Sequence, residues 1–269
     1  MNRNYKEIYD ESLKNPEEFW QKVSEDVFWF KKPTKILKKD NPPFYKWFED
    51  GVTNTCYNAL DLHIDQGRGD KTALIYDSPI TESKAKFTFK ELKEKVSKFA
   101  GALDKQGVKK GDRVIIYMPM IPEAVVAMLA CGRIGAIHSV VFGGFASNEL
   151  ASRIDDSKAK ILITASCGFE PGRTVEYRPL VDGALKLAKH QIEKVILFQR
   201  KDHEIKLNKP LEISWDEALS GANDKDCVEM GANDYAYILY TSGTTGIPKG
   251  IVRDLSLIHI SEPTRPREI

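Results

Sequence analysis

The chain has 269 residues, of which 42% are hydrophobic and 29% are charged. This composition is typical of a folded globular protein and excludes an intrinsically disordered chain. Forty Lys and Arg residues stand against 39 Asp and Glu residues, and this balance argues against a protein whose main role is to coat nucleic acid or an anionic membrane.

The sequence carries no sign of a membrane segment or a secretory leader. The longest apolar stretch, Ile121 to Phe145, is interrupted by Glu123, Arg133 and His138, so we do not expect it to span a membrane. Residues 1–15 carry charges of both signs and no apolar run, which disfavours a signal peptide. We therefore expect a cytoplasmic location and no membrane partner. The four cysteines form no CxxC pair and are expected to be reduced thiols: Cys56, Cys131, Cys167 and Cys227.

Residues 1–62 are rich in aromatic side chains, and prolines interrupt them. Three of the four tryptophans lie here, Trp20, Trp29 and Trp47, with lysines nearby. Such a segment is able to stack nucleic-acid bases and contact phosphates. We favour a second interpretation, in which the aromatic side chains pin an N-terminal extension onto a larger body and the lysines face solvent. On this interpretation no nucleic acid is a partner.

From residue 72 onward, strand-like segments alternate with helix-like segments. Thr88 is predicted to cap a helix, because Glu91 lies three residues further on and apolar residues follow at helical spacing as far as Leu103. The expected strands are residues 72–76, 113–117, 136–142, 161–164, 195–198 and 235–240, and the expected helices are 88–107, 122–131, 147–156 and 180–189. This alternation predicts an α/β fold with a mostly parallel sheet that helices cover on both faces.

The strongest local pattern is TSGTTGIPKG at residues 241–250, directly after an expected strand. Its glycines permit a close backbone approach to a ligand, and its four hydroxyl groups offer hydrogen bonds to phosphate oxygens. Lys249 adds a positive charge. The segment lacks the GK[ST] order of a Walker A loop. We interpret it as a different kind of phosphate-binding loop, the alternative being a surface turn rich in Gly and Thr.

This string resembles the phosphate loop of the AMP-forming acyl-CoA synthetases, which belong to the adenylate-forming enzymes. PEEFW at Pro16–Trp20 and CYNALD at Cys56–Asp61 resemble the N-terminal extension of acetyl- and propionyl-CoA synthetases. Gly111–Phe145 and Asn148–Asp156 are similar to the same enzymes. The resemblance implies that the α/β fold is the N-terminal part of the adenylate-forming large domain, with mostly parallel sheets flanked by helices and an aromatic-rich extension.

The resemblance implies a two-step ligase reaction that uses ATP, CoA and Mg²⁺. ATP and a short-chain carboxylate give an acyl-adenylate and pyrophosphate, and the CoA thiol then displaces AMP. The residues implied to contact the ATP phosphates are Thr241, Ser242, Gly243, Thr244, Thr245, Gly246 and Lys249, with Thr241 and Lys249 assigned as catalytic. The residues implied to contact CoA are Gly143, Gly144, Glu170, Pro171, Gly172 and Arg173. No residue is assigned as a metal ligand, and the sequence indicates no oligomeric state.

We expect three segments along the chain. Residues 1–62 are the extension, residues 63–254 are an incomplete AMP-binding domain, and residues 255–269 are a tail without family resemblance. The tail, LSLIHISEPTRPREI, looks like translated sequencing-adapter read-through and is predicted to be disordered. In the family, later segments hold the adenine site, the acyl pocket and a lid. We therefore expect an N-terminal fragment that is inactive alone and only marginally folded.

The identity of the acid rests on resemblance alone. Glu170–Arg173 and Ile251–Asp254 resemble propionyl-CoA synthetases more than acetyl-CoA synthetases, which places propionate ahead of acetate. Two alternatives remain: a non-catalytic module that binds a nucleotide or CoA, and an adenylating enzyme for amino or aryl acids. The extension and Glu170–Arg173 disfavour the second alternative, and the tail does not look like the cap that a native short module needs.

Overall fold

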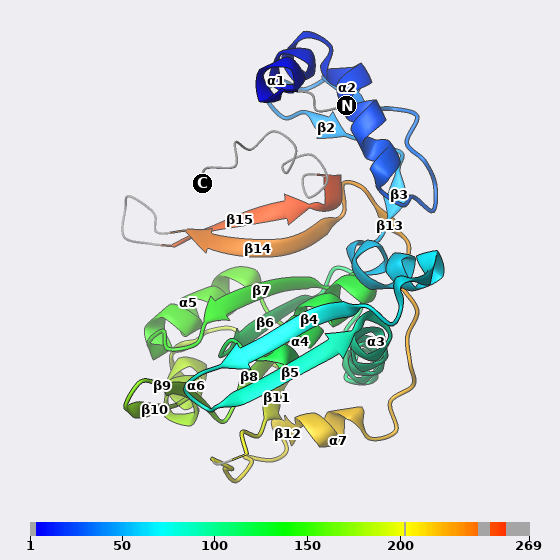
Figure 1. Ribbon diagram of the computed structural model, residues 1–269. Helices are drawn as coiled ribbons and strands as arrows, with labels where there is room; N and C mark the ends of the chain where they lie inside the picture. The colour runs from blue at the N-terminus through cyan, green and yellow to red at the C-terminus, as the bar shows by residue number, and fades with distance from the viewer. Residues whose placement is uncertain (1–3, 202, 242–247, 257–269) are drawn as a thin grey trace.

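A seven-stranded sheet forms the centre of the molecule. In the computed structural model, which describes residues 4–201, 203–241 and 248–256, the strand order is β12-β11-β8-β6-β7-β14-β15 (Figure 1). Neighbouring strands run parallel, except that β15 is antiparallel to β14. The strands are β6 (Arg113–Met118), β7 (Ile137–Phe142), β8 (Ile161–Ala165), β11 (Lys194–Phe198), β12 (Glu212–Ser214), β14 (Tyr235–Thr241) and β15 (Lys249–Asp254). The predicted α/β fold with a mostly parallel sheet is confirmed.

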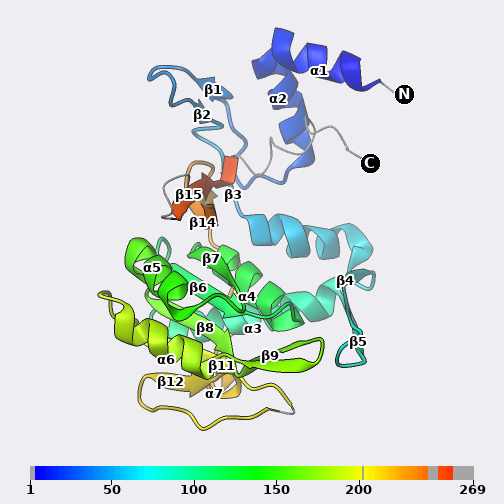
Figure 2. The same ribbon diagram turned by 90° about the vertical axis from the view of Figure 1, so that its left-hand side faces the viewer.

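Helices cover both faces of this sheet. Figure 2 shows α5 and α6 on one side of β6 and β8, and α3 and α4 on the other, while α7 packs against α3. The helices are α3 (Phe89–Lys105), α4 (Pro122–Arg133), α5 (Ser147–Ser157), α6 (Arg178–Leu187) and α7 (Trp215–Leu219). Because both faces of β6 are covered, its residues from Val114 to Met118 are apolar, and Ile115, Ile116 and Tyr117 are fully buried. None of the helices among the described residues has the length and hydropathy needed to cross a bilayer.

The predicted cap of α3 is present. The Thr88 hydroxyl accepts a hydrogen bond from the Glu91 backbone N–H at 3.2 Å, and the Glu91 carboxylate accepts one from the Thr88 backbone N–H at 2.8 Å. This reciprocal pair satisfies two N–H groups that the first turn of a helix otherwise leaves free.

Two hairpins of the larger body lie outside the sheet. The expected strand at residues 72–76 forms, but it pairs antiparallel with the next segment and contacts α3 instead of joining the sheet, as the views in Figures 1 and 2 agree. These strands are β4 (Thr72–Ser78) and β5 (Ser83–Thr88), and a second hairpin follows β8, formed by β9 (Cys167–Glu170) and β10 (Arg173–Glu176). Neither hairpin partner was predicted, because antiparallel pairing depends on contacts beyond the local pattern.

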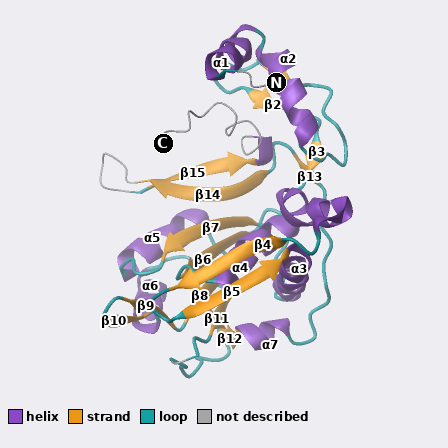
Figure 3. Cartoon of the chain, viewed as in Figure 1, coloured by secondary structure: helices purple, strands orange, loops and turns teal. Residues whose placement is uncertain are grey.

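The N-terminal extension contains short helices and two-residue strands (Figure 3). They are α1 (Tyr5–Lys14), α2 (Pro16–Val23), η1 (Ser24–Asp26), β1 (Leu37–Lys38), β2 (Lys46–Trp47), β3 (Val52–Thr53) and η2 (Tyr57–Asp61). β3 pairs with β13 (Met230–Gly231), and η3 (Ile64–Arg68) follows the extension. A separate cluster buries Phe19, Trp20, Trp29 and Phe48 together with Ala232 from the larger body. The aromatic side chains therefore pin the extension as predicted.

Buried polar contacts complete this junction. The Asn54 side chain is fully buried and donates to the carbonyl oxygens of Gly132 and Val228, both at 2.9 Å. At the other end of the described chain, Leu255 and Ser256, the first residues of the predicted tail, are buried as well. The remainder of the tail, residues 257–269, lies outside the described residues.

Candidate functional site

The predicted phosphate loop connects the two strands of a hairpin. β14 ends at Thr241 and β15 begins at Lys249, and these two residues are directly opposite each other in the antiparallel register. Both are exposed. Ser242, Gly243, Thr244, Thr245 and Gly246 belong to residues 242–247, which lie outside the described residues. The structure thus brings Thr241 and Lys249 together where the hydroxyl-rich segment leaves and re-enters the sheet.

The end of this hairpin next to the connecting segment contacts α5. The Tyr240 hydroxyl donates to the Asp156 carboxylate at 2.7 Å, and burial together with this hydrogen bond raises the pKa of Tyr240. A Cβ at Gly250 would lie 3.1 Å from the Tyr240 ring and 3.2 Å from Asp156 Oδ2. The final glycine of TSGTTGIPKG is therefore needed for packing, in addition to any role with a ligand.

Gly143 and Gly144 follow β7 at its carboxyl end. A Cβ at Gly143 would overlap the Tyr177 hydroxyl and lie 2.8 Å from the Met118 carbonyl oxygen. Gly144 has φ +131°, a backbone conformation that side chains rarely adopt, and its N–H lies 3.3 Å from the Tyr117 hydroxyl oxygen, which accepts a hydrogen bond. Glycine is thus required at both positions by the surrounding chain, and the result is a stretch of bare backbone.

Glu170, Pro171, Gly172 and Arg173 form the end of the β9–β10 hairpin. Arg173 stands opposite Glu170 in the register, and its Nε donates to Glu170 Oε2 at 2.7 Å. The Arg173 side chain is 71% exposed. An ion pair in this position is screened by water and contributes little to stability, so the guanidinium is free to exchange its partner for an anionic ligand.

The strand order brings Gly143–Gly144 and the β9–β10 hairpin to one edge of the sheet. Taken in chain order, β7-β6-β8-β11-β12 reads 2-1-3-4-5, and in sheets of this order ligands bind outside the carboxyl ends of the first and third strands. Gly143 and Gly144 follow β7, and the β9–β10 hairpin follows β8. A Cβ at Gly144 would lie 4.0 Å from Glu170 Oε1. The predicted CoA residues are therefore neighbours in space.

One residue that the sequence analysis did not single out joins both predicted sites. Arg153, on α5, is 6% exposed, and its guanidinium lies 5.1 Å from the ring centroid of Phe145 and 5.1 Å from that of Tyr240. Phe145 follows the two glycines, and Tyr240 precedes the phosphate loop. The available signal was the spacing of Arg153 and Asp156, three residues apart and so on one helix face.

Cys167 is the first residue of β9 in the β9–β10 hairpin and has no features of a nucleophile. It is fully buried, and burial raises the pKa of its thiol. A neutral buried thiol is unreactive.

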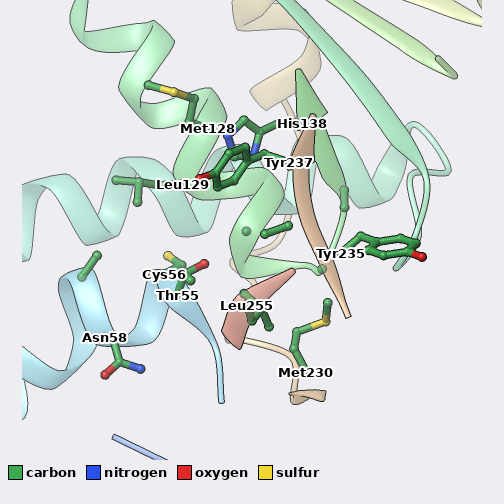
Figure 4. A pocket seen from close by; sticks show the side chains of 15 residues that line it. Thr55, Cys56, Asn58, Met128, Leu129, His138, Met230, Tyr235, Tyr237 and Leu255 are labelled. Carbon is green, nitrogen blue, oxygen red and sulfur yellow. The ribbon is translucent and has the colours of Figure 1, made fainter. Parts of the chain in front are cut away.

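A hollow that the sequence did not predict lies between the extension, α4 and β14 (Figure 4). It encloses about 460 Å³ and is lined mainly by apolar side chains. His138 lies at its edge, 5.7 Å from the Tyr237 ring centroid, and its Nδ1 has no hydrogen-bond partner among the described residues. Burial lowers the pKa of His138 to about 4, so the ring is neutral at pH 7.

Two protein families match the sequence. Residues 63–256 match the family described as AMP-binding enzyme, and residues 5–59 match the acetyl-coenzyme A synthetase N-terminus. The two matches lie end to end and together extend over most of the chain.

Curated proteins and a solved structure give the same result. The chain is 53% identical over 250 residues to the human "Acyl-CoA synthetase short-chain family member 3, mitochondrial", covering 93% of this chain and 36% of that protein. It is 46% identical over 256 residues to "Acetyl-coenzyme A synthetase" of Xylella fastidiosa, covering 92% and 39%. Among solved structures, acetoacetyl-CoA synthetase from Streptomyces lividans superposes with a TM-score of 0.86 at 26% identity, covering 96% and 39%. The chain thus spans less than two-fifths of the length of these three proteins.

Proposed function

The chain belongs to the AMP-binding enzyme family, and on that premise we propose that it is the N-terminal portion of a short-chain acyl-CoA synthetase. We propose that ATP binds at the β14–β15 hairpin and CoA at the carboxyl ends of β7 and β8, the strands on either side of β6. The observation that carries the proposal is the placement of Thr241 opposite Lys249, with the hydroxyl-rich segment between them.

The first half-reaction places a carboxylate against the α-phosphate of ATP, so two anions must approach each other. Catalysis therefore depends on neutralising and positioning charge. The Lys249 ammonium group supplies a mobile positive charge, and the Thr241 hydroxyl supplies a hydrogen-bond donor to a phosphate oxygen. A hydrogen bond to a charged acceptor contributes about 1.5–3 kcal/mol. Mg²⁺ prefers oxygen ligands; the Thr241 hydroxyl and the ATP phosphates fit that preference, and the bound ion would reduce the negative charge on the phosphates.

The second half-reaction requires CoA beside the acyl-adenylate. The guanidinium of Arg173 is planar and can bind a phosphate through two parallel hydrogen bonds. The present ion pair with Glu170 is exposed to water and does not prevent this exchange. Gly143 and Gly144 leave backbone uncovered at the same edge of the sheet. We propose that Arg173 exchanges Glu170 for a phosphate of CoA and that the ligand then lies along these two glycines.

We propose propionate as the preferred acid, with acetate second. The support is the resemblance of Glu170–Arg173 and Ile251–Asp254 to propionyl-CoA synthetases. Two further statements stay predictions. One is the division into an extension, an AMP-binding segment and a tail, and the other is the cytoplasmic location. Cell fractionation of the native protein would test the location, since the human relative carries the word mitochondrial in its name.

Binding measurements with the chain test both ligand sites separately. We expect Lys249→Gln to weaken the binding of ATP about tenfold and to leave the binding of CoA unchanged. We expect Arg173→Gln to weaken the binding of CoA about tenfold and to leave that of ATP unchanged. The loss of one charge-assisted hydrogen bond predicts this magnitude. Lys186→Gln, on the surface of α6, is the matched control. Equal affinities in all three variants would contradict the proposed sites.

Turnover separates the enzyme from the alternative. We expect no acyl-CoA formation by the 269-residue chain. Re-sequencing the gene through and beyond codon 254 would supply any longer reading frame, whose product we expect to form propionyl-CoA faster than acetyl-CoA. Ligand binding without turnover in that product would favour a non-catalytic CoA-binding module.

A further inference from the structure

A buried cluster away from the proposed site joins three parts of the chain. The Arg133 guanidinium, on α4, is fully buried and forms a two-pronged ion pair with Asp61, with Nη1 at 2.7 Å and Nη2 at 3.0 Å from the two carboxylate oxygens. The same Nη1 lies 3.1 Å from the sulfur of Cys227 and 3.6 Å from that of Cys56. Asp61 and Cys56 belong to the extension, and Cys227 to the segment before β13.

The two sulfur atoms lie close enough to react with each other. The sulfurs of Cys56 and Cys227 and an oxygen of Asp61 all lie within 4.8 Å of one another. Such a set resembles a partial zinc site, but the permanently charged guanidinium of Arg133 already contacts all three groups and would repel a cation. A disulfide needs sulfurs about 2.0 Å apart, which side-chain rotation and a small shift of the segment around Cys227 would provide.

The charges around the pair activate one thiol. A hydrogen bond from Cys227 and the nearby Arg133 lower the pKa of Cys56 despite its burial, although the Asp61 carboxylate opposes them. The bond to Cys56 and burial raise the pKa of Cys227, which keeps its proton. By contrast, burial alone raises the pKa of Cys131 to about 12. Because the thiolate is the reactive form and one buried guanidinium lies beside both sulfurs, this pair is more reactive than Cys131.

A small oxidant reaches the pair through Cys227, which is only partly buried. Cys56 is fully buried, although it is among the residues that line the hollow of about 460 Å³ shown in Figure 4. Residues 222–229 form no helix or strand, and hydrogen bonds from Asn54 and Arg133 to the Val228 and Lys225 carbonyl oxygens hold this segment beside α4. Cys131 and Cys167 are fully buried and are not among the residues that line the hollow.

We propose that Cys56 and Cys227 are a modification site that forms a disulfide when the chain meets hydrogen peroxide. The Cys56 thiolate attacks one peroxide oxygen, so that an S–O bond forms, the O–O bond breaks, and the departing hydroxide takes up a proton as water. The sulfur of Cys227 then attacks the Cys56 sulfenic acid, the S–O bond breaks, and a second water leaves with the Cys227 proton. Two thiols lose two electrons in total, and one peroxide becomes two waters.

The bond would join the extension to the segment that leads into β14. That strand begins the hairpin whose far end carries Thr241. The inference does not depend on the proposed ligase activity, because its readout is a covalent bond between two named residues.

Peptide mapping of the oxidised chain tests the proposal directly. The reduced chain would be exposed to hydrogen peroxide, its remaining thiols blocked with N-ethylmaleimide, and its peptides analysed by mass spectrometry without reduction. We expect a Cys56–Cys227 linked pair that has lost two hydrogen atoms, is cleaved by dithiothreitol, and forms about tenfold faster than Cys131 or Cys167 is oxidised.

Variants identify the order of events. We expect Cys227→Ser to abolish the linked peptide and leave a sulfenic acid at Cys56 that dimedone traps, whereas Cys131→Ser keeps the linked peptide. Peptide mapping of the unsubstituted chain needs no variant, so a folding defect in Cys227→Ser would not weaken the test. The proposal is overturned if no linked pair forms, if Cys131 or Cys167 supplies a partner, or if the pair forms only in urea.

Discussion

Gly143 belongs to a predicted ligand site, and close packing also requires a glycine at this position. Its missing side chain leaves room for the Tyr177 hydroxyl and the Met118 carbonyl group. We expect Gly143→Ala to lower the free energy of unfolding by about 1–3 kcal/mol, as overpacking does in closely packed regions. Urea unfolding would measure this loss.

A second substitution tests the cause of that loss. Tyr177→Phe removes the hydroxyl that a Cβ would meet first, so the double variant should recover part of the stability, with a coupling of about 0.5–3 kcal/mol. If the two substitutions are additive, the contact with Tyr177 is not the reason for glycine at this position.

His138 makes the stability of the chain depend on pH. Burial lowers its pKa from 6.5 to about 4 in the folded chain, so the unfolded chain takes up a proton first as the pH falls below 6.5. The stabilisation is therefore complete above pH 6.5 and is lost between pH 6.5 and 4, by about 3 kcal/mol at most. Unfolding free energies of His138→Gln should show a flatter slope in this range. An unchanged slope, or the same flattening in His203→Gln, would contradict the assignment.

At the residue scale, the sequence predicted side chains that belong to contiguous strings. Thr241 and Lys249 lie in one such string, and the structure places them opposite each other. It did not predict Arg153 or Tyr177, whose partners lie in other elements. A buried cation between two aromatic rings, or a hydroxyl that fills the space beside a glycine, depends on the folded arrangement and has no local pattern.

Helix α3 shows an element whose start was predictable, because its cap is local. We expect Thr88→Ala to lower the free energy of unfolding by about 1 kcal/mol, through the loss of the hydrogen bond to the Glu91 N–H. Thr174→Ala, at an exposed position on β10, is the control with little expected change in urea unfolding. A loss in Thr174→Ala as large as that in Thr88→Ala would remove the argument for the cap.

Strand β14 is the weakly attached element of the sheet. Among the described residues, it pairs with β7 at a single register position, Tyr237 opposite His138, whereas β8 and β11 pair at five positions. We expect the amides of β14 and β15 to exchange with deuterium at least about tenfold faster than those of β8 and β11, because local opening costs less free energy where fewer contacts break. Equal protection in hydrogen-exchange mass spectrometry would contradict this interpretation.

Strand pairing also marks where prediction at the element scale failed. The alternation of strands and helices predicted β6, β7, β8 and β11 within a residue or two, and their parallel arrangement with them. The same pattern predicted residues 72–76 as a strand but gave no indication that it would pair with β5, away from the sheet. The spacing of apolar residues predicts that a segment is a strand. The strand with which it pairs depends on which strand edge is available once the other elements have packed.

At the scale of the whole molecule, the edge proposed to bind CoA follows from strand order. No single segment of sequence contains it, because Gly143–Gly144 and Glu170–Arg173 meet only after β7 and β8 take places on either side of β6. The resemblance supplied the pairing of these residues, and the fold supplies its physical reason.

The surface around β15 makes a prediction for the whole chain in solution. Leu239, Ile251 and Val252 are 40–48% exposed on the β14–β15 hairpin, and among the described residues β15 has no strand on its outer side. An apolar strand with unpaired N–H and C=O groups pairs readily with another chain. We therefore expect the chain to self-associate as its concentration rises. Light scattering after size-exclusion chromatography should show Val252→Lys shifted toward the monomer and Leu187→Lys, an exposed position on α6, unchanged. A monomer at all concentrations would show that this edge is protected in solution.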